Sequence, residues 1–343
     1  MRKKILVFCL LTLSLIDFNP CFAASENKNE GFNAGDMIMH HILDSYEWHI
    51  INIKDKHITI YLPVIIYSKE RGLILFSSSK FQNKTHSYKG FIMDHGTIIS
   101  KTGEKFYDIS ITKNVLSLFI SIALLLFIFV GIGKKYTKNI KKAPKGLQSF
   151  FEPIILFVKD DIVQPSIGEK NYKKFLPFLL TLFFFIWINN LLGLIPVFPG
   201  GANLTGNIAV PFVLATIILI LTLINGKKTY WTHIFAMPGV PKWVLTILTP
   251  IEIFGIFLKP LVLMIRLFAN ITAGHIIILS FFSLIFIFGD LFGSVAGYGV
   301  SVMSIAFTIF MTMLELIVAF LQAYVFTLLS AMYFGMAVEE GHH

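Results

Sequence analysis

The chain has 343 residues, of which 55% are hydrophobic and only 14% are charged, and its formal net charge is +9. Soluble domains average about 25% charged residues, so the composition excludes an ordinary soluble domain, and its apolar content excludes a disordered chain. Only Cys9 and Cys21 are present, which also excludes a scaffold built on disulfides.

The positive charge is concentrated in one short segment. Residues 1–133 contain 14 basic and 11 acidic residues, residues 134–174 contain 10 and 4, and residues 175–343 contain 5 and 5. An excess of Lys that directly follows a hydrophobic stretch is typical of a cytoplasmic loop of a membrane protein. We therefore expect no nucleic-acid partner, since that function favours basic residues interleaved with exposed aromatic residues on a soluble fold.

Residues 1–24 predict a secretory signal peptide. A basic start at residues 2–4 precedes an apolar stretch at residues 5–16, which is too short to span a bilayer. Small residues follow, so cleavage is expected after Ala23 or Ala24. The alternative is a short anchor that stays uncleaved.

Residues 25–113 are polar and mixed, and they predict a small exported segment. Residues 58–68 and 72–78 are rich in β-branched and aromatic side chains, so a β-hairpin is expected around the turn at residues 69–72. Six of the ten His residues lie in this segment, but their spacing fixes no metal geometry. We expect surface or packing roles for them and no metal site.

Five hydrophobic segments follow, and together they predict an all-α polytopic membrane protein over residues 114–343. They are residues 115–132, 175–197, 208–224, 244–288 and 295–338.

The last two segments are too long to cross a bilayer upright. A helix over residues 244–288 would be about 67 Å long, roughly twice the hydrocarbon thickness. These helices must tilt, break or extend beyond the lipid, and Pro250 and Pro260 are candidate kinks. The Gly-rich stretch 289–299 predicts the turn of a long tilted antiparallel hairpin.

The charge pattern also predicts the orientation. An exported N-terminus brings the first segment into the cytoplasm at a cluster of six Lys between residues 134 and 145. A second basic loop, with Lys227, Lys228 and Lys242, lies on the same side. Five crossings then leave the C-terminus in the cytoplasm, and we expect a multi-pass protein of a bacterial inner membrane with a periplasmic N-terminus.

The last two segments carry side chains that are costly in lipid. An ionisable group at the bilayer centre costs roughly 2.5–3.5 kcal/mol on the insertion scale. The polar and ionisable residues of these segments are Glu252, Lys259, Arg266, Asn270, His275, Glu315 and Gln322. Lys259 could extend its ammonium group to the interface, whereas Arg266 has about 22 residues of apolar segment on either side.

The spacing pairs these residues across the predicted hairpin. Residue 294 is the midpoint between Arg266 and Gln322, and residue 295 is the midpoint between His275 and Glu315. We therefore expect Arg266 to meet an amide acceptor and His275 to meet a carboxylate. An intramembrane His–Glu pair predicts a proton relay, and the alternative is a polar pair that only holds the helices together.

Arg266 cannot itself carry the proton, because a guanidinium group does not lose its charge in a protein. It can serve as a fixed positive charge. A partner carboxylate within ~4 Å would gain roughly 4 kcal/mol at an effective dielectric constant of 20.

Several motifs resemble subunit a of F-type ATP synthases, and the resemblance covers roughly residues 110–340. Lys259-Pro260 precedes the sequence IRLFAN at residues 265–270, and LQAYVF at residues 321–326 is similar to the last-helix motif of the family. NLLGLIP at residues 190–196 resembles its second-span motif.

The resemblance implies a non-catalytic stator subunit, without a cofactor, that carries protons past a rotating ring of subunit c. Other expected partners are the peripheral-stalk subunit b, the remaining ATP synthase subunits and the bilayer. It implies that Arg266 faces the ring carboxylate, that Glu252 lies toward the cytoplasmic exit, and that five residues belong to the periplasmic access path. Those five are Asn190, Asn270, His275, Glu315 and Gln322.

This chain departs from many bacterial members in two respects. Those members have the acid where this chain has His275, and His where it has Glu315, so the order of proton transfer within the pair stays open. Gly193 stands where some members have Asp, so that acid cannot be required here.

Two other functions have less support. A standalone secondary transporter would favour internal repeats, which we do not find. An intramembrane hydrolase would need a nucleophile or a metal motif, and no H-E-x-x-H or G-x-S-x-G occurs in the spans. The chain also lacks a phosphate-binding loop, so ATP chemistry must reside on partners.

Overall fold

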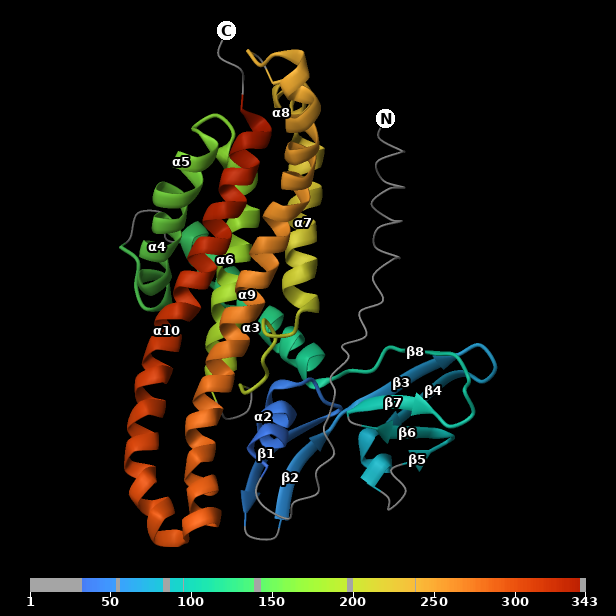
Figure 1. Cartoon of the computed structure of the whole chain (residues 1–343). Helices are drawn as coiled ribbons and strands as arrows, with labels where there is room; N and C mark the ends of the chain where they lie inside the picture. The colour runs from blue at the N-terminus through green and yellow to red at the C-terminus, as the bar shows by residue number, and fades with distance from the viewer. Residues whose placement is uncertain are drawn as a thin grey trace. The chain divides into compact units, whose positions relative to one another are not determined.

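The structure is a computed structural model, and Figure 1 shows its long helices and a smaller part built from short strands. It describes residues 33–339 except 54–55, 83–86, 95, 139–142, 196–199 and 238. The predicted signal peptide, residues 1–24, lies outside the described residues. The predicted fold class, an all-α polytopic membrane protein with a small β-containing N-terminal segment, is confirmed.

The small N-terminal part starts with helix α2 (Ala34–Ile42), whose first turn is capped by the Asn33 side chain. A 3₁₀ turn, η1 (Ser78–Gln82), lies among the strands. The strands are β1 (Glu47–Ile53), β2 (Lys56–Tyr61), β3 (Pro63–Ser68), β4 (Gly72–Ser77), β5 (Ser87–Tyr88), β6 (Phe91–Asp94), β7 (Thr97–Ser100) and β8 (Phe106–Asp108). They form three antiparallel sheets with the orders β1-β2, β4-β3-β8 and β5-β6-β7.

The predicted β-hairpin is formed by β3 and β4, with Ser68 paired to Gly72 and Pro63 to Ser77. The predicted first strand, residues 58–68, is instead divided at Leu62, because β2 pairs with β1 and β3 pairs with β4. Alternate side chains of β3 and β4 point inward, as the two-residue period of a strand requires. These inward side chains pack with Phe81 of η1, Phe91 of β6 and Ile98 of β7. Together they form a small hydrophobic core of Val64, Ile66, Ile74, Phe76, Phe81, Phe91 and Ile98.

A buried lysine joins this part to the first long helix, α3 (Lys113–Lys138). The Lys113 Nζ atom donates to the carbonyl oxygens of His41, at 3.3 Å, and Leu43, at 3.4 Å, at the end of α2. The Asp44 carboxylate accepts the backbone N–H of Asn114 at 3.0 Å and so caps the start of α3. The end of α2 and the start of α3 are therefore tied by charge and by hydrogen bonds.

A second polar contact lies beside this junction. Burial raises the pKa of the Tyr46 hydroxyl above its usual range, and its hydrogen bond to Asp108 raises the pKa further. Tyr46 therefore keeps its proton and remains a donor to the end of β8 at any pH at which the protein is folded.

The membrane part contains five long helices and shorter connecting helices. The long helices are α3, α6 (Tyr172–Leu194), α7 (Ala209–Asn225), α9 (Lys242–Phe292) and α10 (Ser294–Val338). The connecting helices are α4 (Leu147–Phe157), the π-helix η2 (Val158–Val163), α5 (Gln164–Ile167) and α8 (Lys228–Phe235).

Four of these helices are long and apolar enough to cross a membrane, namely α3, α6, α9 and α10. Helix α7 is shorter, and it joins α8 at a bend of 103°; if this pair is one span, the described residues contain five. The prediction of about five membrane-crossing helices agrees with this range.

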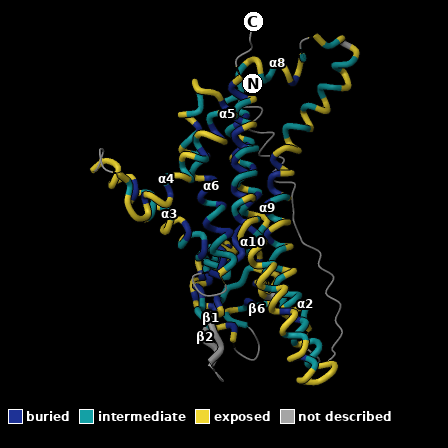
Figure 2. The backbone as a smooth tube through the Cα atoms, turned by 90° about the vertical axis from the view of Figure 1, so that its left-hand side faces the viewer, coloured by how far each residue is buried: buried dark blue, intermediate teal, exposed yellow. Residues whose placement is uncertain are grey.

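Helices α9 and α10 form the predicted antiparallel hairpin and run side by side in Figures 1 and 2. The connection is shorter than the predicted turn at residues 289–299: only Gly293, at φ +84°, separates the two helices. Pro250 and Pro260, the candidate kinks, both lie inside α9, and neither ends it. In lipid a broken helix would leave backbone groups without partners, which favours one continuous helix of about 76 Å.

The helices differ in how much of their surface the chain itself covers (Figure 2). We compared how much of an 18-residue apolar stretch in each helix is buried. The buried share is 50% in α6, 17% in α3 and in α10, and 11% in α9. Helix α6 therefore lies at the centre of the packing, with Leu179, Phe183 and Ile186 fully covered. The apolar surfaces of the other helices are left for lipid or for other proteins.

The junction between α2 and α3 yields a stability prediction. Replacing Asp44 with Ala removes the cap of α3 and a carboxylate close to Lys113, which should destabilise the junction by about 1–2 kcal/mol. Hydrogen exchange of the amides of residues 34–46 should speed up in Asp44→Ala. Glu70→Ala, in the exposed turn between β3 and β4, is the control and should leave exchange unchanged; equal protection in Asp44→Ala would contradict the role given to the cap.

Candidate functional site

The predicted His275–Glu315 pair is present, and it joins α9 to α10. The His275 Nδ1 atom lies 3.1 Å from the Glu315 Oε1 atom, and the two side chains are only 14% and 4% exposed. An acid and a base thus meet away from water at the contact between the two longest helices. The contact that the hairpin midpoint predicted is confirmed.

The His275 ring faces an acceptor at each nitrogen. Its Nδ1 atom also lies 3.0 Å from the carbonyl oxygen of Ile271, and its Nε2 atom lies 3.3 Å from the carbonyl oxygen of Gly193 on α6. Neutral imidazole has one donor, whereas the protonated ring has two. The surroundings of His275 can therefore satisfy both N–H groups of the charged ring.

Glu315 is less completely satisfied than its partner. Among the described residues, neither of its buried carboxylate oxygens accepts a hydrogen bond, although Oε1 lies 3.1 Å from the His275 Nδ1 atom; Oε2 faces no donor at all. Buried carboxylate oxygens are nearly always bonded to a donor or to water. This oxygen is therefore a place where a proton or a water molecule can bind.

A glycine makes the close approach of Glu315 possible. A Cβ atom at Gly274 would lie 2.3 Å from the Glu315 Oε1 atom and 2.7 Å from its Cδ atom. Real Cβ atoms do not approach other heavy atoms so closely, so with any other residue at position 274 the Glu315 side chain would have to shift from its present position.

Asn190 lies on α6 near this pair and is buried. Its Nδ2 atom donates to the carbonyl oxygen of Ala319, at 3.2 Å, one turn beyond Glu315 on α10. Its Oδ1 atom accepts from the Thr205 hydroxyl at 2.7 Å. Asn190 thereby connects α6, α10 and the segment before α7 at the depth of the acid–base pair.

The predicted contact between Arg266 and Gln322 is not found. Arg266 is half-buried on α9, and it forms no hydrogen bond or ion pair within the described residues; its electrostatic neighbour is Tyr333 on α10. Gln322 is buried at 7% exposure, and Asn270 is exposed. Equal sequence distance from the turn therefore did not predict the partner of Arg266.

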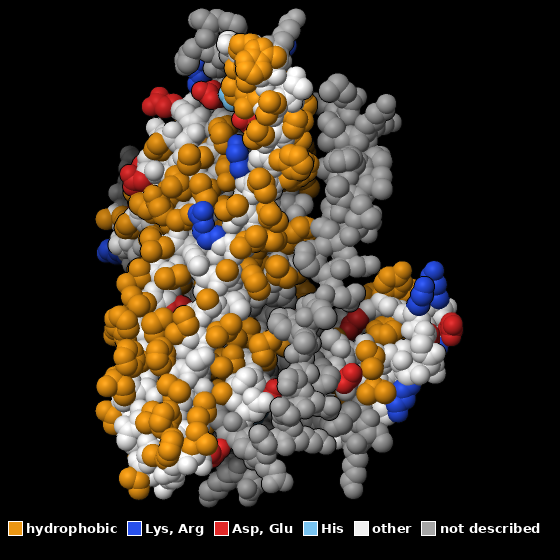
Figure 3. Space-filling view, viewed as in Figure 1, with side chains coloured by type: hydrophobic (Ala, Val, Ile, Leu, Met, Phe, Trp, Pro, Cys, Tyr) orange, Lys and Arg blue, Asp and Glu red, His pale blue; other side chains and the backbone are white. Residues whose placement is uncertain are grey.

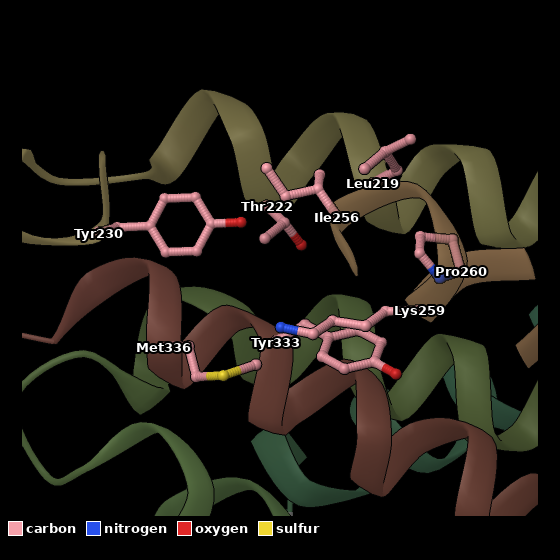
Figure 4. A pocket seen from close by; sticks show the side chains of 8 residues that line it. All are labelled: Leu219, Thr222, Tyr230, Ile256, Lys259, Pro260, Tyr333 and Met336. Carbon is pink, nitrogen blue, oxygen red and sulfur yellow. The ribbon is translucent and has the colours of Figure 1, made fainter. Parts of the chain in front are cut away.

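A separate pocket lies between α7, α8, α9 and α10, and Figure 4 shows it from close by. It encloses about 280 Å³ of empty space, part of it open to solvent. Its lining comprises Leu219, Thr222, Tyr230, Ile256, Lys259, Pro260, Tyr333 and Met336. The Tyr230 hydroxyl points toward Thr222, and the Lys259 side chain lies alongside Tyr333 (Figure 4).

Electrostatic interactions connect this pocket to two of the predicted site residues. Glu252, half-buried on α9, interacts with Tyr230, and Arg266 interacts with Tyr333. Glu252 thus lies near one residue of the pocket lining and Arg266 near another.

Some residues of this arrangement were not predicted as site residues. The carbonyl oxygens of Gly193 and Ile271 carry no side-chain signal, and Thr205 lies in a loop far from any motif. Tyr230 and Tyr333 could have been noticed as polar aromatic residues beside hydrophobic segments. Among the described residues, no group of three or more His, Cys, Asp and Glu side chains could hold a metal ion.

The long apolar helices and the acid–base pair buried between them define a multi-pass membrane protein with ionisable groups inside the membrane. Comparison with family models agrees with this class: residues 115–335 match the family described as ATP synthase A chain. Residues 37–116 match a domain of unknown function, DUF8433.

Relatives with curated descriptions extend the match over most of the chain. The chain is 40% identical to "ATP synthase subunit a 2" of Chlorobaculum tepidum over 93% of this chain and 79% of that protein. It is 41% identical to "ATP synthase subunit a" of Chloroherpeton thalassium, over 69% of each. With the protein of the same name from Myxococcus xanthus it shares 37% identity, over 73% of this chain and 80% of the relative.

The chain belongs to the ATP synthase subunit a family. It is thus a non-catalytic membrane subunit of an F-type ATP synthase and works together with other subunits of that complex.

The close approach at Gly274 gives a mutational prediction. In Gly274→Ala the added methyl group should displace the Glu315 carboxylate, and ATP-driven proton pumping by the assembled synthase should fall on the order of tenfold or more. Pumping is measured in inverted membrane vesicles by quenching of a pH-sensitive dye, at matched amounts of assembled complex.

Gly255→Ala is the matched control, because a Cβ atom at Gly255, on the same helix, would meet nothing within 4 Å. Gly255→Ala should pump normally. Normal pumping by Gly274→Ala would show that the position of Glu315 does not depend on the glycine.

Proposed function

We propose that this subunit is the proton-conducting stator of its ATP synthase, with two half-channels that deliver protons to, and collect them from, a rotating ring of subunit c. Proton flow through it is thereby coupled to ATP synthesis. The observation that carries the proposal is the buried His275–Glu315 pair, because burying ionisable groups in a membrane is costly without a task for them.

The access path runs through the acid–base pair. A proton from the periplasm reaches His275 and Glu315, and Asn190 and Gln322 belong to the same access path. The two acceptors facing the His275 ring and the unpartnered Glu315 Oε2 atom support proton binding at either residue. Asn270, exposed one turn beyond Arg266 on α9, lies where the proton would pass to the ring.

Arg266 acts as the fixed positive charge that faces the ring carboxylate. It forms no ion pair within the described residues, which leaves its guanidinium group available to a partner acid. That acid would ionise beside Arg266, since attraction at ~4 Å is worth roughly 4 kcal/mol at an effective dielectric constant of 20. Arg266 would also stop a proton from passing directly between the half-channels, because guanidinium does not release its own proton.

The exit path runs along the pocket between α7, α8, α9 and α10. A proton released near Arg266 passes Tyr333, Lys259 and Tyr230 and leaves beside Glu252. The electrostatic interactions of Arg266 with Tyr333 and of Glu252 with Tyr230 support this route. Each charge that crosses at 100 mV supplies about 2.3 kcal/mol.

The topology is part of the same proposal. Residues 1–24 are a signal peptide, residues 25–113 an exported periplasmic segment, and residues 114–343 the ion-channel domain in a bacterial inner membrane. The C-terminus then lies in the cytoplasm, where the peripheral-stalk subunit b can contact the basic loops. The two family matches meet at residues 115–116, which supports a division close to residue 113.

Arg266→Lys tests the role of the fixed charge. Lys keeps a positive charge, but it is a compact ammonium group that can lose its proton when buried, so coupled transport should be lost. ATP-driven pumping in inverted vesicles should fall to the background level in Arg266→Lys. Lys135→Arg, at the far end of α3, makes a comparable exchange away from the path and should pump normally; pumping by Arg266→Lys at the wild-type rate would refute the role of Arg266.

The acid–base pair gives a second prediction. Exchanging the two residues, as His275→Glu with Glu315→His, keeps one acid and one base in contact. This double variant should retain more pumping than either His275→Ala or Glu315→Ala, whose remaining partner is left buried and unpaired. Equal loss in all three variants would show that the residues do not act as a reciprocal pair.

A further inference from the structure

The outward face of the sheet β4-β3-β8 is a continuous apolar surface. Cross-strand partners put Leu73, Tyr67 and Tyr107 in one row across the three strands, and this row faces outward. A second row follows the same register, because Ile65 pairs with Leu75 and the Ile109 N–H group donates to the Ile65 carbonyl oxygen. We call these six residues the apolar sheet face.

The apolar sheet face is left largely exposed in the part of the chain that the structure describes. Leu73, Leu75, Tyr107 and Ile109 are 67%, 62%, 64% and 63% exposed. The opposite face of the same sheet is already buried in the small hydrophobic core. An antiparallel sheet with one face in water normally alternates apolar and polar residues, so a sheet that is apolar on both faces requires a second covering layer.

The strand β8 is followed closely in the chain by α3, the first candidate membrane-spanning helix. Only residues 109–112 separate β8 from α3, and four extended residues span at most about 14 Å. The linking residues also stay paired with β3, because the Ile111 N–H group donates to the Pro63 carbonyl oxygen at 3.2 Å. The sheet is thus separated by only a few residues from the start of a helix that is long and apolar enough to cross a membrane.

The chemistry of the face matches a lipid interface. Tyr67 and Tyr107 are amphipathic aromatic residues of the kind that gather at the level of the headgroups. Lys69 lies two residues after Tyr67, and Lys105 lies two residues before Tyr107. Because side chains on a strand alternate between its two faces, both lysines are expected on the same side and at the same end of the sheet, and both are exposed. Hydrophobic side chains with Lys or Arg beside them are visible over the strands in Figure 3. Apolar residues bordered by Lys fit acyl chains below anionic headgroups.

We propose that the apolar sheet face docks on the bilayer, in the leaflet from which α3 departs, with Lys69 and Lys105 against anionic headgroups. This assigns a membrane-surface contact to the domain of unknown function at residues 37–116. The domain thereby fixes the start of α3 at the interface. The proposal depends on the membrane-spanning helix α3 and not on the direction of proton flow.

Site-directed labelling of the full-length chain tests the docking. Cys9 and Cys21 are replaced with Ser, Leu75→Cys carries a bimane fluorophore, and the chain is reconstituted in vesicles of phosphatidylethanolamine and phosphatidylglycerol. Leu73→Cys provides a second site on the face, in case the first label disturbs folding. Thr97→Cys, exposed on β7 in the other three-stranded sheet, is the matched control.

Lipids with a spin label high on the acyl chain should quench bimane at Leu75 and Leu73, and aqueous iodide should quench it at Thr97. Replacing Lys69 and Lys105 with Gln should lower the ratio of docked to undocked protein by about fivefold per lysine. Iodide quenching at Leu75 equal to that at Thr97 would overturn the proposal. Protection of Leu75 from both quenchers would also overturn it, since a second copy or another subunit would then cover the face.

Discussion

The contact between His275 and Glu315 is the interaction on which the rest of the membrane part depends. A charge in lipid is costly, so an acid and a base on neighbouring helices stabilise each other only at one relative position of α9 and α10. The single-residue turn at Gly293 sets that position, and the missing side chain of Gly274 leaves room for the carboxylate. Asn190 and the Gly193 carbonyl group bring α6 to the same depth.

The same constraint explains which parts of the protein need other molecules. Helix α6 is covered by its neighbours, whereas α9 leaves most of its apolar surface open, and Arg266 lies on that helix without an ion pair in the described part of the chain. An arginine in lipid with no counter-charge is unfavourable, which is why we propose that an acid of another subunit faces Arg266. The apolar sheet face of the N-terminal domain likewise exposes hydrophobic side chains that another molecule would have to cover.

Much of the framework could be predicted from the sequence, because it depends on patterns that survive without coordinates. The length of the hydrophobic segments predicted the candidate membrane spans. The midpoint of the predicted turn predicted the His275–Glu315 contact, and the β-branched residues on either side of residues 69–72 predicted the hairpin of β3 and β4. These features follow from periodicity and from equal spacing about a turn, which are properties of the chain alone.

Features that depend on side-chain direction or on backbone atoms could not be predicted. Equal distance from the turn did not bring Arg266 to Gln322, because a long flexible side chain can leave its helix face. The roles of the Gly193 carbonyl group and of Thr205 became visible only when distant segments were seen together.

Proton flux into liposomes tests the central claim most directly. The chain is reconstituted with and without its subunit c ring, and passive flux is followed after a potential is applied; ATP-driven pumping by the whole synthase is compared before and after Arg266→Ala. The half-channel account predicts flux only when the ring is present, and pumping that disappears in the variant. If the chain alone moved protons or another solute without the ring, the account would be contradicted, and Arg266 would belong to the substrate site of a transporter.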